Sequence, residues 1–437
     1  MPRLCGNRPC KPHSKHRRCP DEVVWIALIQ SGVLDCLDFL NFLYTLDGVR
    51  NMRYGGFMES SQTLASKPDP PERPRRGAGR GSNFSVLHRP VWSTLCRMET
   101  TSRMNLVTTF LVLLAGTGSD HRLTKWSAKA CEEHTGLGKP RAKQAIEELI
   151  REGLVERTDA STVMMPQYRL PEVPRDAEPI FLPRQLITGL GAATPLLRRV
   201  RETGSFLALR MLIDLYGMVE TDATQGIRIE KLRKGGWEDV TARKVCEAGV
   251  NAIWALPIPD MTWAGGEWVD AFLDKAKGAR DKWKPLWEAE NLLEQIGAIW
   301  FEPWIFQGAG PEAEPLLPID PAVLYSYSEG DEVTRLTRLM QEAATAFIGD
   351  RDYLIDQYAN DILVPLPLHH QPPAIRQVAR MTVEADTPGN RRGYALRMRT
   401  IERGTAALEK LISVTIEGSF NRPISYGPAA GMEEANA

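Results

Sequence analysis

The sequence has few cysteines, and their placement excludes a disulfide framework. Seven of them lie scattered at positions 5, 10, 19, 36, 96, 131 and 246. Disulfide-stapled secreted domains use an even number of cysteines at characteristic spacings. A secretory signal is also missing, because the first apolar run begins only at Val23. We therefore expect a cytoplasmic protein.

A run long and apolar enough to cross a membrane is absent as well. The best candidate, VVWIALIQSGVLDCLDFLNFLYTL, contains Asp35 and Asp38. Each of these carboxylates would cost about 2.5–3.5 kcal/mol near the centre of a bilayer. Gln30 and Asn41 add to that cost. The run predicts an amphipathic helix, and we expect no membrane partner.

The common catalytic motifs are missing too. There is no G-x-S-x-G, no H-E-x-x-H and no Rossmann glycine fingerprint. The GLGK at 136–139 is not a P-loop, because Glu133 stands where that motif needs glycine and Pro140 where it needs Ser or Thr. We expect no enzyme and no cofactor.

The first hundred residues are basic and rich in residues that disfavour folding. Residues 1–103 carry 16 Lys and Arg against 9 Asp and Glu, and SKPDPPERPRRGAGRGSN reads as linker. The metal-ligand types Cys5, Cys10, His13, His16 and Cys19 match no standard zinc spacing, so we expect no metal. The pattern predicts a largely disordered leader over 1–103. A chain starting at Met98 or Met104 is then expected to unfold cooperatively.

Periodic structure begins at residue 104. Met104 to Ala115 predicts an apolar helix, and Ser127 to His134 predicts a shorter one capped by Ser127. After Thr135-Gly136-Leu137, a third helix is predicted from Pro140 to Glu152 with Lys139 as its N-cap. Gly153 ends it, and LVER and VMMPQYRL predict two strands. The third helix has one apolar stripe, made of Ala142, Ala145, Ile146 and Leu149.

This order of elements resembles the winged helix-turn-helix superfamily over residues 104–172. The resemblance implies that the third helix lies in the major groove of double-stranded DNA with its N-terminal half nearest the bases. It then implies that Lys139 contacts phosphate and that Arg141, Lys143 and Gln144 read bases. The wing tip carries Asp159 and no basic residue, so wing contacts to phosphate rest on Arg157 or Arg169. The same unit could instead serve only protein contacts.

A degraded second copy is predicted at 204–306, after a linker at 173–203. When Gly297 is matched to Gly153, LWEAENLLEQIGAIWF repeats the spacing of the third helix and strand. FLALRMLIDLYGMV supplies a first helix, and an insert carries the candidate strand AIWALPIP. Eight of the eleven tryptophans lie between Trp237 and Trp304. They form either a core or a partner surface, since aromatic residues are enriched at interfaces.

The C-terminal part is predicted to be helical over 331–437, after a linker at 307–330. Helices are expected at Glu332 to Ile348 and Tyr353 to Ile362, followed by a proline-rich loop, VPLPLHHQPP. A last helix is expected from Arg391 to Ile412. Its spacing aligns four basic residues within about 20° on one face, which fits either a nucleic-acid contact or a solvated surface. These residues are Arg392, Arg399, Arg403 and Lys410.

Together these patterns predict a mainly α protein with short β-wings, built from tandem winged helices and a helical C-terminal region. The expected function is sequence-specific binding of double-stranded DNA, and a homodimer is a possible form. The layout resembles plasmid or phage replication initiators and, equally, large transcriptional regulators. The alternative is a protein-interaction adaptor that uses the Trp-rich middle domain.

Overall fold

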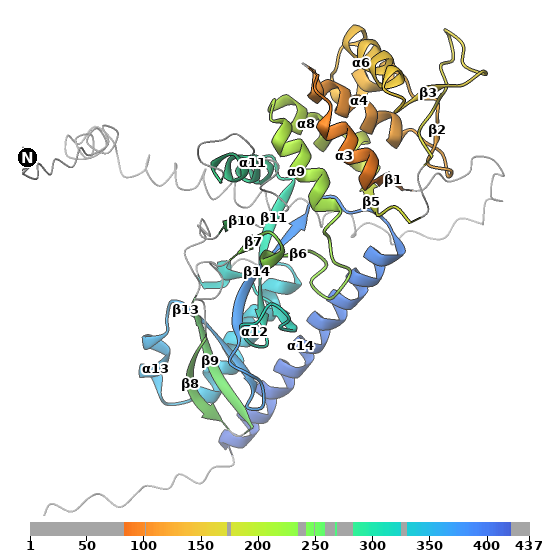
Figure 1. The fold of residues 1–437 in the computed structure, drawn as a ribbon. Helices are drawn as coiled ribbons and strands as arrows, with labels where there is room; N and C mark the ends of the chain where they lie inside the picture. The colour runs from red at the N-terminus through yellow and green to blue at the C-terminus, as the bar shows by residue number, and fades with distance from the viewer. Residues whose placement is uncertain are drawn as a thin grey trace, which may run out of the picture. The chain divides into compact units, whose positions relative to one another are not determined.

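The computed structural model describes residues 83–420 apart from 101, 173–175, 235–241, 249, 258–266, 269–282 and 325–329 (Figure 1). All of these residues belong to the unit Ala78–Ala437. The predictions for the apolar run at 23–46, the Cys/His cluster at 5–19 and most of the linker at 66–83 lie outside the described residues. Within the described part, no helix is both long and apolar enough to cross a membrane.

The described residues form a mixed α/β structure of helices and several small antiparallel sheets. A mainly α fold with short wings was expected, and the difference lies in the C-terminal half. There, one sheet has four strands and another has three. Several of their strands are formed by residues that the sequence pattern assigned to linkers, inserts, helices and loops.

The first described elements contradict the expected leader. Strand β1 (Phe84–His88) pairs with β5 (Pro179–Pro183), and helix α3 (Arg89–Arg97) follows it directly. Trp92 and Leu95 on α3 are buried in the same core as α4. The predicted boundary at 103 was wrong because a strand of 5 residues and a helix of 9 are too short to show a clear period.

The expected linker at 173–203 is also structured. Besides β5 it holds helices α7 (Gln185–Thr188) and α8 (Leu196–Glu202). Leu186, Leu197 and Val200 are buried in the same core. These short elements are stabilised by packing against their neighbours and not by their own length.

Trp92 gives a direct test of this boundary. Its side chain is 2% exposed, and its Nε1 donates to the buried Asp214 at 2.9 Å. Trp92→Ala should lower the free energy of unfolding by about 3–5 kcal/mol through the cavity it leaves. The matched control is Arg97→Ala, an exposed position on the same helix, which should change stability by less than about 0.5 kcal/mol. Chemical denaturation measures both, and equal stability of the two variants would contradict a structural role for α3. A chain that starts at Met98 should likewise lose its cooperative melt.

The three helices predicted at 104–152 are confirmed almost residue for residue. They are α4 (Arg103–Ala115), α5 (Ala128–Thr135) and α6 (Lys139–Arg151). Ser127 caps α5 as expected, accepting a hydrogen bond from the backbone N–H of Lys129. Gly138 and not Lys139 is the N-cap of α6, so Pro140 lies one position further into the helix than predicted. A proline is still tolerated there, since the first four N–H groups of a helix have no partner within it.

A small antiparallel sheet completes this part of the chain. Strand β4 (Tyr168–Arg169) lies between β2 (Leu123–Thr124) and β3 (Glu156–Arg157). Gly153, at the end of α6, has a φ of 69°, a left-handed conformation that favours glycine. The chain therefore turns sharply from α6 into β3, as the sequence predicts.

The same succession recurs further along the chain. Helix α9 (Phe206–Tyr216) packs against α11 (Lys284–Gln295), as α4 packs against α6. Gly297 follows α11 with a φ of 64°. The junctions also share a hydrogen bond: Leu154 N to Leu149 O at 2.9 Å, and Ala298 N to Leu293 O at 2.7 Å.

The sheet that follows α11 repeats the strand order of the small sheet that follows α6. Strand β14 (Ala374–Met381) lies between β6 (Ile227–Arg228) and β11 (Ile299–Phe306), as β4 lies between β2 and β3. The counterpart of α5 is reduced to the 3-10 turn η1 (Ile229–Lys231), after which β7 (Arg233–Lys234) pairs with β10 (Glu267–Trp268). The second part of the chain thus repeats both the helix–glycine–strand junction and the strand order of the first part.

Two insertions enlarge this second part. The first contains β8 (Arg243–Ala248) and β9 (Asn251–Pro257), which confirms the strand expected in AIWALPIP. The second separates β11 from β14 and contains β12 (Pro315–Pro318), η3 (Pro321–Leu324), α12 (Glu332–Ile348), α13 (Asp352–Gln357) and β13 (Asp361–Pro367). Strands from the two insertions form one sheet, in the order β13-β9-β8.

Only the first part of the proline-rich loop expected at 364–373 is a strand: residues 364–367 belong to β13, whereas 368–373 form a turn and loop as expected. Among the described strands β13 pairs only with β9, and an edge strand tolerates residues that lack a backbone N–H. Helix α12 has the predicted bounds, whereas the second predicted helix ends at Gln357 because the chain enters β13. The last helix, α14 (Pro388–Phe420), is confirmed and is longer than predicted.

Candidate nucleic-acid interface

The turn between α5 and α6 is tightly held. Gly136 has a φ of 69°, and Leu137 beside it is 1% exposed. The Thr135 hydroxyl donates to the carbonyl oxygen of Cys131 and accepts from the N–H of Leu137 at 3.3 Å. Arg201 of α8 donates to the carbonyl oxygen of Thr135 at 2.7 Å. These contacts fix the direction in which α6 leaves the turn.

Helix α6 has one buried face and one open face. Ala142, Ala145, Ile146 and Leu149 are buried, as the sequence predicts. The open face begins at the N-terminus of the helix. It presents four side chains singled out from the sequence, namely Lys139, Arg141, Lys143 and Gln144, all of them exposed.

The charge on this open face is unevenly distributed. The first turn of α6 contains no acidic residue, and Arg151 is the basic residue of its last turn. Lys139 forms an ion pair with Glu132 of α5 at 3.2 Å, with both side chains about half exposed. An ion pair in water contributes only about 0–1 kcal/mol. An incoming phosphate can therefore take the place of Glu132 beside Lys139.

The two arginines predicted to act in the wing have different surroundings. Arg157 on β3 forms a 2.6 Å ion pair with Glu147 of α6, which ties strand β3 to the helix. Arg169 on β4 is exposed. Because the Arg157–Glu147 pair is also exposed, both arginines can make an added contact with an anion.

A second basic surface lies on α14. Arg392, Arg399, Arg403 and Lys410 are all exposed, as expected from their helical spacing. The first and last of them are about 27 Å apart along the helix axis, at 1.5 Å per residue. We refer to these four residues as the α14 stripe.

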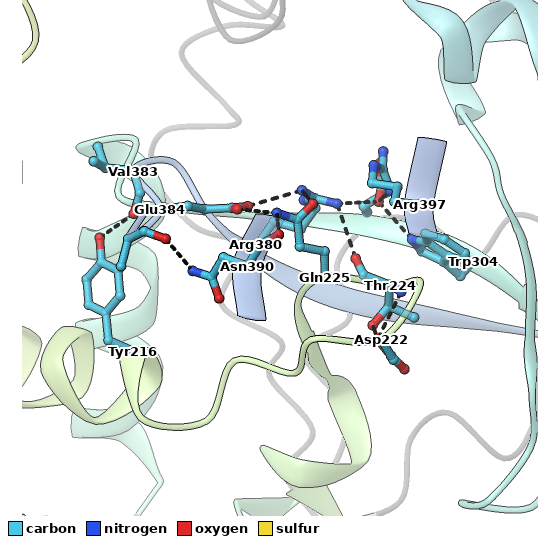
Figure 2. Close-up of polar contacts among 12 residues, drawn as sticks. Tyr216, Asp222, Thr224, Gln225, Trp304, Arg380, Val383, Glu384, Asn390 and Arg397 are labelled. Carbon is cyan, nitrogen blue, oxygen red and sulfur yellow. Dashed lines mark hydrogen bonds and ion pairs between the residues drawn. The ribbon is translucent and has the colours of Figure 1, made fainter. Parts of the chain in front are cut away.

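A buried ionic network holds the opposite side of α14 (Figure 2). Arg397 lies about 140° around the helix from Arg392, and both of its terminal nitrogens donate to the carboxylate of Glu302 on β11 at 2.6 Å. Trp304 donates to the same carboxylate at 2.7 Å, and Arg380 of β14 lies 3.5 Å from it. This anchoring turns the α14 stripe away from the core.

Arg380 extends the network toward the loop before β6. It donates to the carbonyl oxygen of Thr224 at 3.2 Å and to Glu384 at 3.2 Å, and Gln225 also contacts Glu384 (Figure 2). Burial lowers the pKa of Arg380 and raises that of Glu384. Arg380 lies beside the carboxylates of Glu302 and Glu384, and Arg397 lies beside Glu302, so each of these four charges has an opposite charge next to it.

Asp222 ties the same loop to β6. Burial alone would raise its pKa, but hydrogen bonds from Arg228 and Thr224 outweigh burial and lower it. Arg228 donates to the carboxylate at 2.8 Å. At the other end of the network, beside Glu384, Tyr216 of α9 donates to the carbonyl oxygen of Val383 at 2.7 Å (Figure 2). The network therefore connects α9, β6, β11, β14 and α14.

Sequence patterns did not reveal this network. In AIRQVARM every residue is buried, including Arg376 and Arg380, although a buried strand is expected to read as apolar. Glu302 likewise stands among Trp and Phe residues without a recognisable spacing to any arginine. Only the pairing of β11 with β14 brings these charges together.

The predicted tryptophan cluster is mainly core among the residues described. Trp304 is fully buried, and Trp283 and Trp287 pack against the largest core. Arg233 lies over the Trp287 ring at 4.2 Å and pairs with the buried Glu290. Trp237 and Trp263 lie outside the described residues, as do Arg280 and Lys282, while Lys284 forms an exposed ion pair with Glu288 at 3.9 Å.

Comparison with known proteins adds no further constraint. No family model, no curated protein and no solved structure matches the chain.

Glu302 is the position at which the network is tested. Replacing it with Gln leaves Arg380 and Arg397 beside a neutral group, so the free energy of unfolding should fall by about 3–5 kcal/mol. Arg392→Gln, on the exposed side of α14, is the control and should change stability by less than about 0.5 kcal/mol. Denaturant melts of both variants measure the effect. A loss at position 302 no larger than at 392 would show that the network does not stabilise the fold.

Proposed function

We propose that this protein binds double-stranded DNA sequence-specifically through a winged helix-turn-helix at about 104–172. The observation that carries the proposal is the open face of α6. Its core side is fixed by α4 and α5, while Arg141, Lys143 and Gln144 reach into solvent from its N-terminal half. Arginine pairs with guanine and glutamine with adenine through two hydrogen bonds each.

The order of elements supports a winged helix. Three helices, a left-handed glycine and a hairpin follow one another, and a short strand before α5 joins the hairpin sheet. In such a unit the last helix lies in the major groove. The N-terminus of α6 then brings the positive end of its dipole and Lys139 close to a backbone phosphate.

The second copy fits a supporting role. When Gly297 is matched to Gly153, the positions of Arg141, Lys143 and Gln144 are occupied by Pro285, Trp287 and Glu288. Arg233 covers Trp287, and the exposed Glu288 is acidic, so this face of α11 lacks the free basic side chains of α6. Base reading therefore rests on α6, and the second winged-helix-like unit serves as a scaffold for the insertions and α14.

The α14 stripe adds affinity without sequence information. Its four exposed cations extend over about 27 Å, a length that spans several phosphates of a duplex with one charge per about 1.7 Å. Phosphate contacts position a protein on DNA but do not distinguish bases. The proposal covers a replication initiator and a transcriptional regulator alike. Selection of bound duplexes from a random pool would identify the sequence that α6 reads.

Single substitutions on α6 test the proposal. Arg141→Ala or Gln144→Ala should each relax the preference at one base pair, a discrimination of about 1–3 kcal/mol. Lys139→Ala should weaken binding to all sequences alike, because a phosphate contact carries no base information. Competition binding with the selected duplex and its single-base variants measures these effects.

Two controls accompany these substitutions. Arg151→Ala removes an exposed cation from the far end of the same helix and should leave the base preference intact. Leu149→Ala should lower stability by about 2–5 kcal/mol through a core cavity. Unchanged affinity and preference in folded Arg141→Ala and Gln144→Ala proteins would refute the reading role of α6 and favour a protein-interaction module.

The α14 stripe is tested by its salt dependence. Replacing Arg392, Arg399 and Arg403 with Gln should weaken binding to every sequence and lower the slope of log affinity against log salt by roughly 0.9 per lost contact. Arg97→Gln, at an exposed arginine of α3, is the control and should leave the slope unchanged. If the slope of the triple variant equals that of the wild type, these arginines are only surface charge.

A further inference from the structure

The wing between β3 and β4 holds three consecutive apolar side chains in water. Val163 is 99% exposed, Met164 89% and Met165 74%. No other three consecutive residues among the large exposed hydrophobic side chains of the described chain form such a run. Isolated exposed apolar residues are ordinary, but a contiguous group marks a contact site.

This tip is an ordered turn. The N–H of Thr162 donates to the carbonyl oxygen of Met165 at 3.1 Å, and the N–H of Met165 donates to the Thr162 hydroxyl at 2.9 Å. The N–H of Gln167 is held by the Ser161 hydroxyl at 3.0 Å. The ordered backbone therefore holds the three side chains in solvent, where they do not pack against a core of the described chain.

The part of the tip that follows Asp159 carries no charge. From Ala160 to Gln167 there is no Asp, Glu, Lys or Arg, so the tip itself cannot bind phosphate by charge. Nevertheless, only residues 152–155 separate the end of α6 from β3, and the Arg157–Glu147 ion pair ties β3 to that helix. In Figure 1 the hairpin projects away from the helices beyond β3.

From these observations we propose that Val163, Met164 and Met165 form an apolar wedge that enters the DNA minor groove next to the site read by α6. The proposal rests on the proposed DNA-binding function. Because β3 follows α6 so closely, a hairpin attached to a helix in the major groove, which is about 12 Å wide, would be within reach of the adjoining backbone and minor groove. Apolar side chains inserted there partly unstack a base step and bend the duplex. Steps that unstack easily, such as TA and CA, are then favoured under the wing.

The experiment uses the full chain and the duplex selected from the random pool, with 2-aminopurine placed at successive steps beside the α6 site. The wild type should raise 2-aminopurine fluorescence severalfold at one step, and energy transfer between the duplex ends should report a bend. A V163S/M164S/M165S variant should keep the base preference of α6 but lose the fluorescence rise and the bend. Its affinity should fall at least about tenfold, because three apolar contacts are lost.

The matched controls are Leu190→Ser and Tyr353→Ser, which remove exposed apolar side chains of 47% and 66% exposure far from the wing in sequence. Both should bind and bend DNA as the wild type does. Because all the replaced side chains are exposed, the variants should keep their melting temperatures.

Each other outcome overturns the wedge. The wedge is wrong, while the DNA-binding function stands, in either of two cases. In the first, the wild type binds DNA selectively but 2-aminopurine fluorescence rises at no base step. In the second, the triple variant still raises that fluorescence at one step. If the wild type binds no duplex, both proposals fail together. If the triple variant loses a dimer in sedimentation and still bends DNA, the tip joins two copies of this chain.

Discussion

The fold of the C-terminal half depends on the buried ion pairs that the Glu302 carboxylate forms with Arg380 and Arg397. Removing three charges from water costs several kcal/mol per ion, and that cost is met only when each charge is paired and hydrogen-bonded. Here the carboxylate receives two bonds from Arg397 and one from Trp304, while Arg380 continues to Glu384 and Thr224. If β11, β14 or α14 packed differently, at least one of these charges would be buried without a partner. Few other arrangements of the three elements are therefore stable.

A second buried arginine reinforces the same sheet. Arg376, fully buried on β14, donates to the carbonyl oxygens of Gly308 and Gly310 and pairs with Glu230 at 3.3 Å. Its guanidinium also lies 4.9 Å from the centre of the Phe306 ring. Apolar packing alone would tolerate a shift of β14 by two residues, whereas these directional contacts do not. The network thus fixes the register of β11 against β14 and, through Arg397, the rotation of α14.

The two copies of the helix–glycine–strand junction show how one local pattern serves different purposes. In the first, the helix keeps an open, basic N-terminal half and a buried apolar stripe. In the second, Trp287 and Glu290 take positions that correspond to Lys143 and Ile146, and Arg233 fills the space beside them. Insertions before α11 and after β11 then build a further sheet. We infer that the first copy retained the contact with DNA and that the second became the scaffold that orients α14.

The amino-acid sequence by itself determined the local elements whose signals are short in range. Ser127, Gly136, Gly153 and the stripe through Leu149 gave the helices of the first unit and the open face of α6, because caps and helical periodicity depend on neighbours within a few residues. The bounds of α12 and the exposed stripe of α14 followed in the same way. Tertiary structure alone decided what depends on distant partners. It paired β1 with β5, made an edge strand of a proline-rich segment and brought Glu302, Arg380 and Arg397 together. Residues 95 positions apart in sequence form that ion pair, and no local period can encode such a separation.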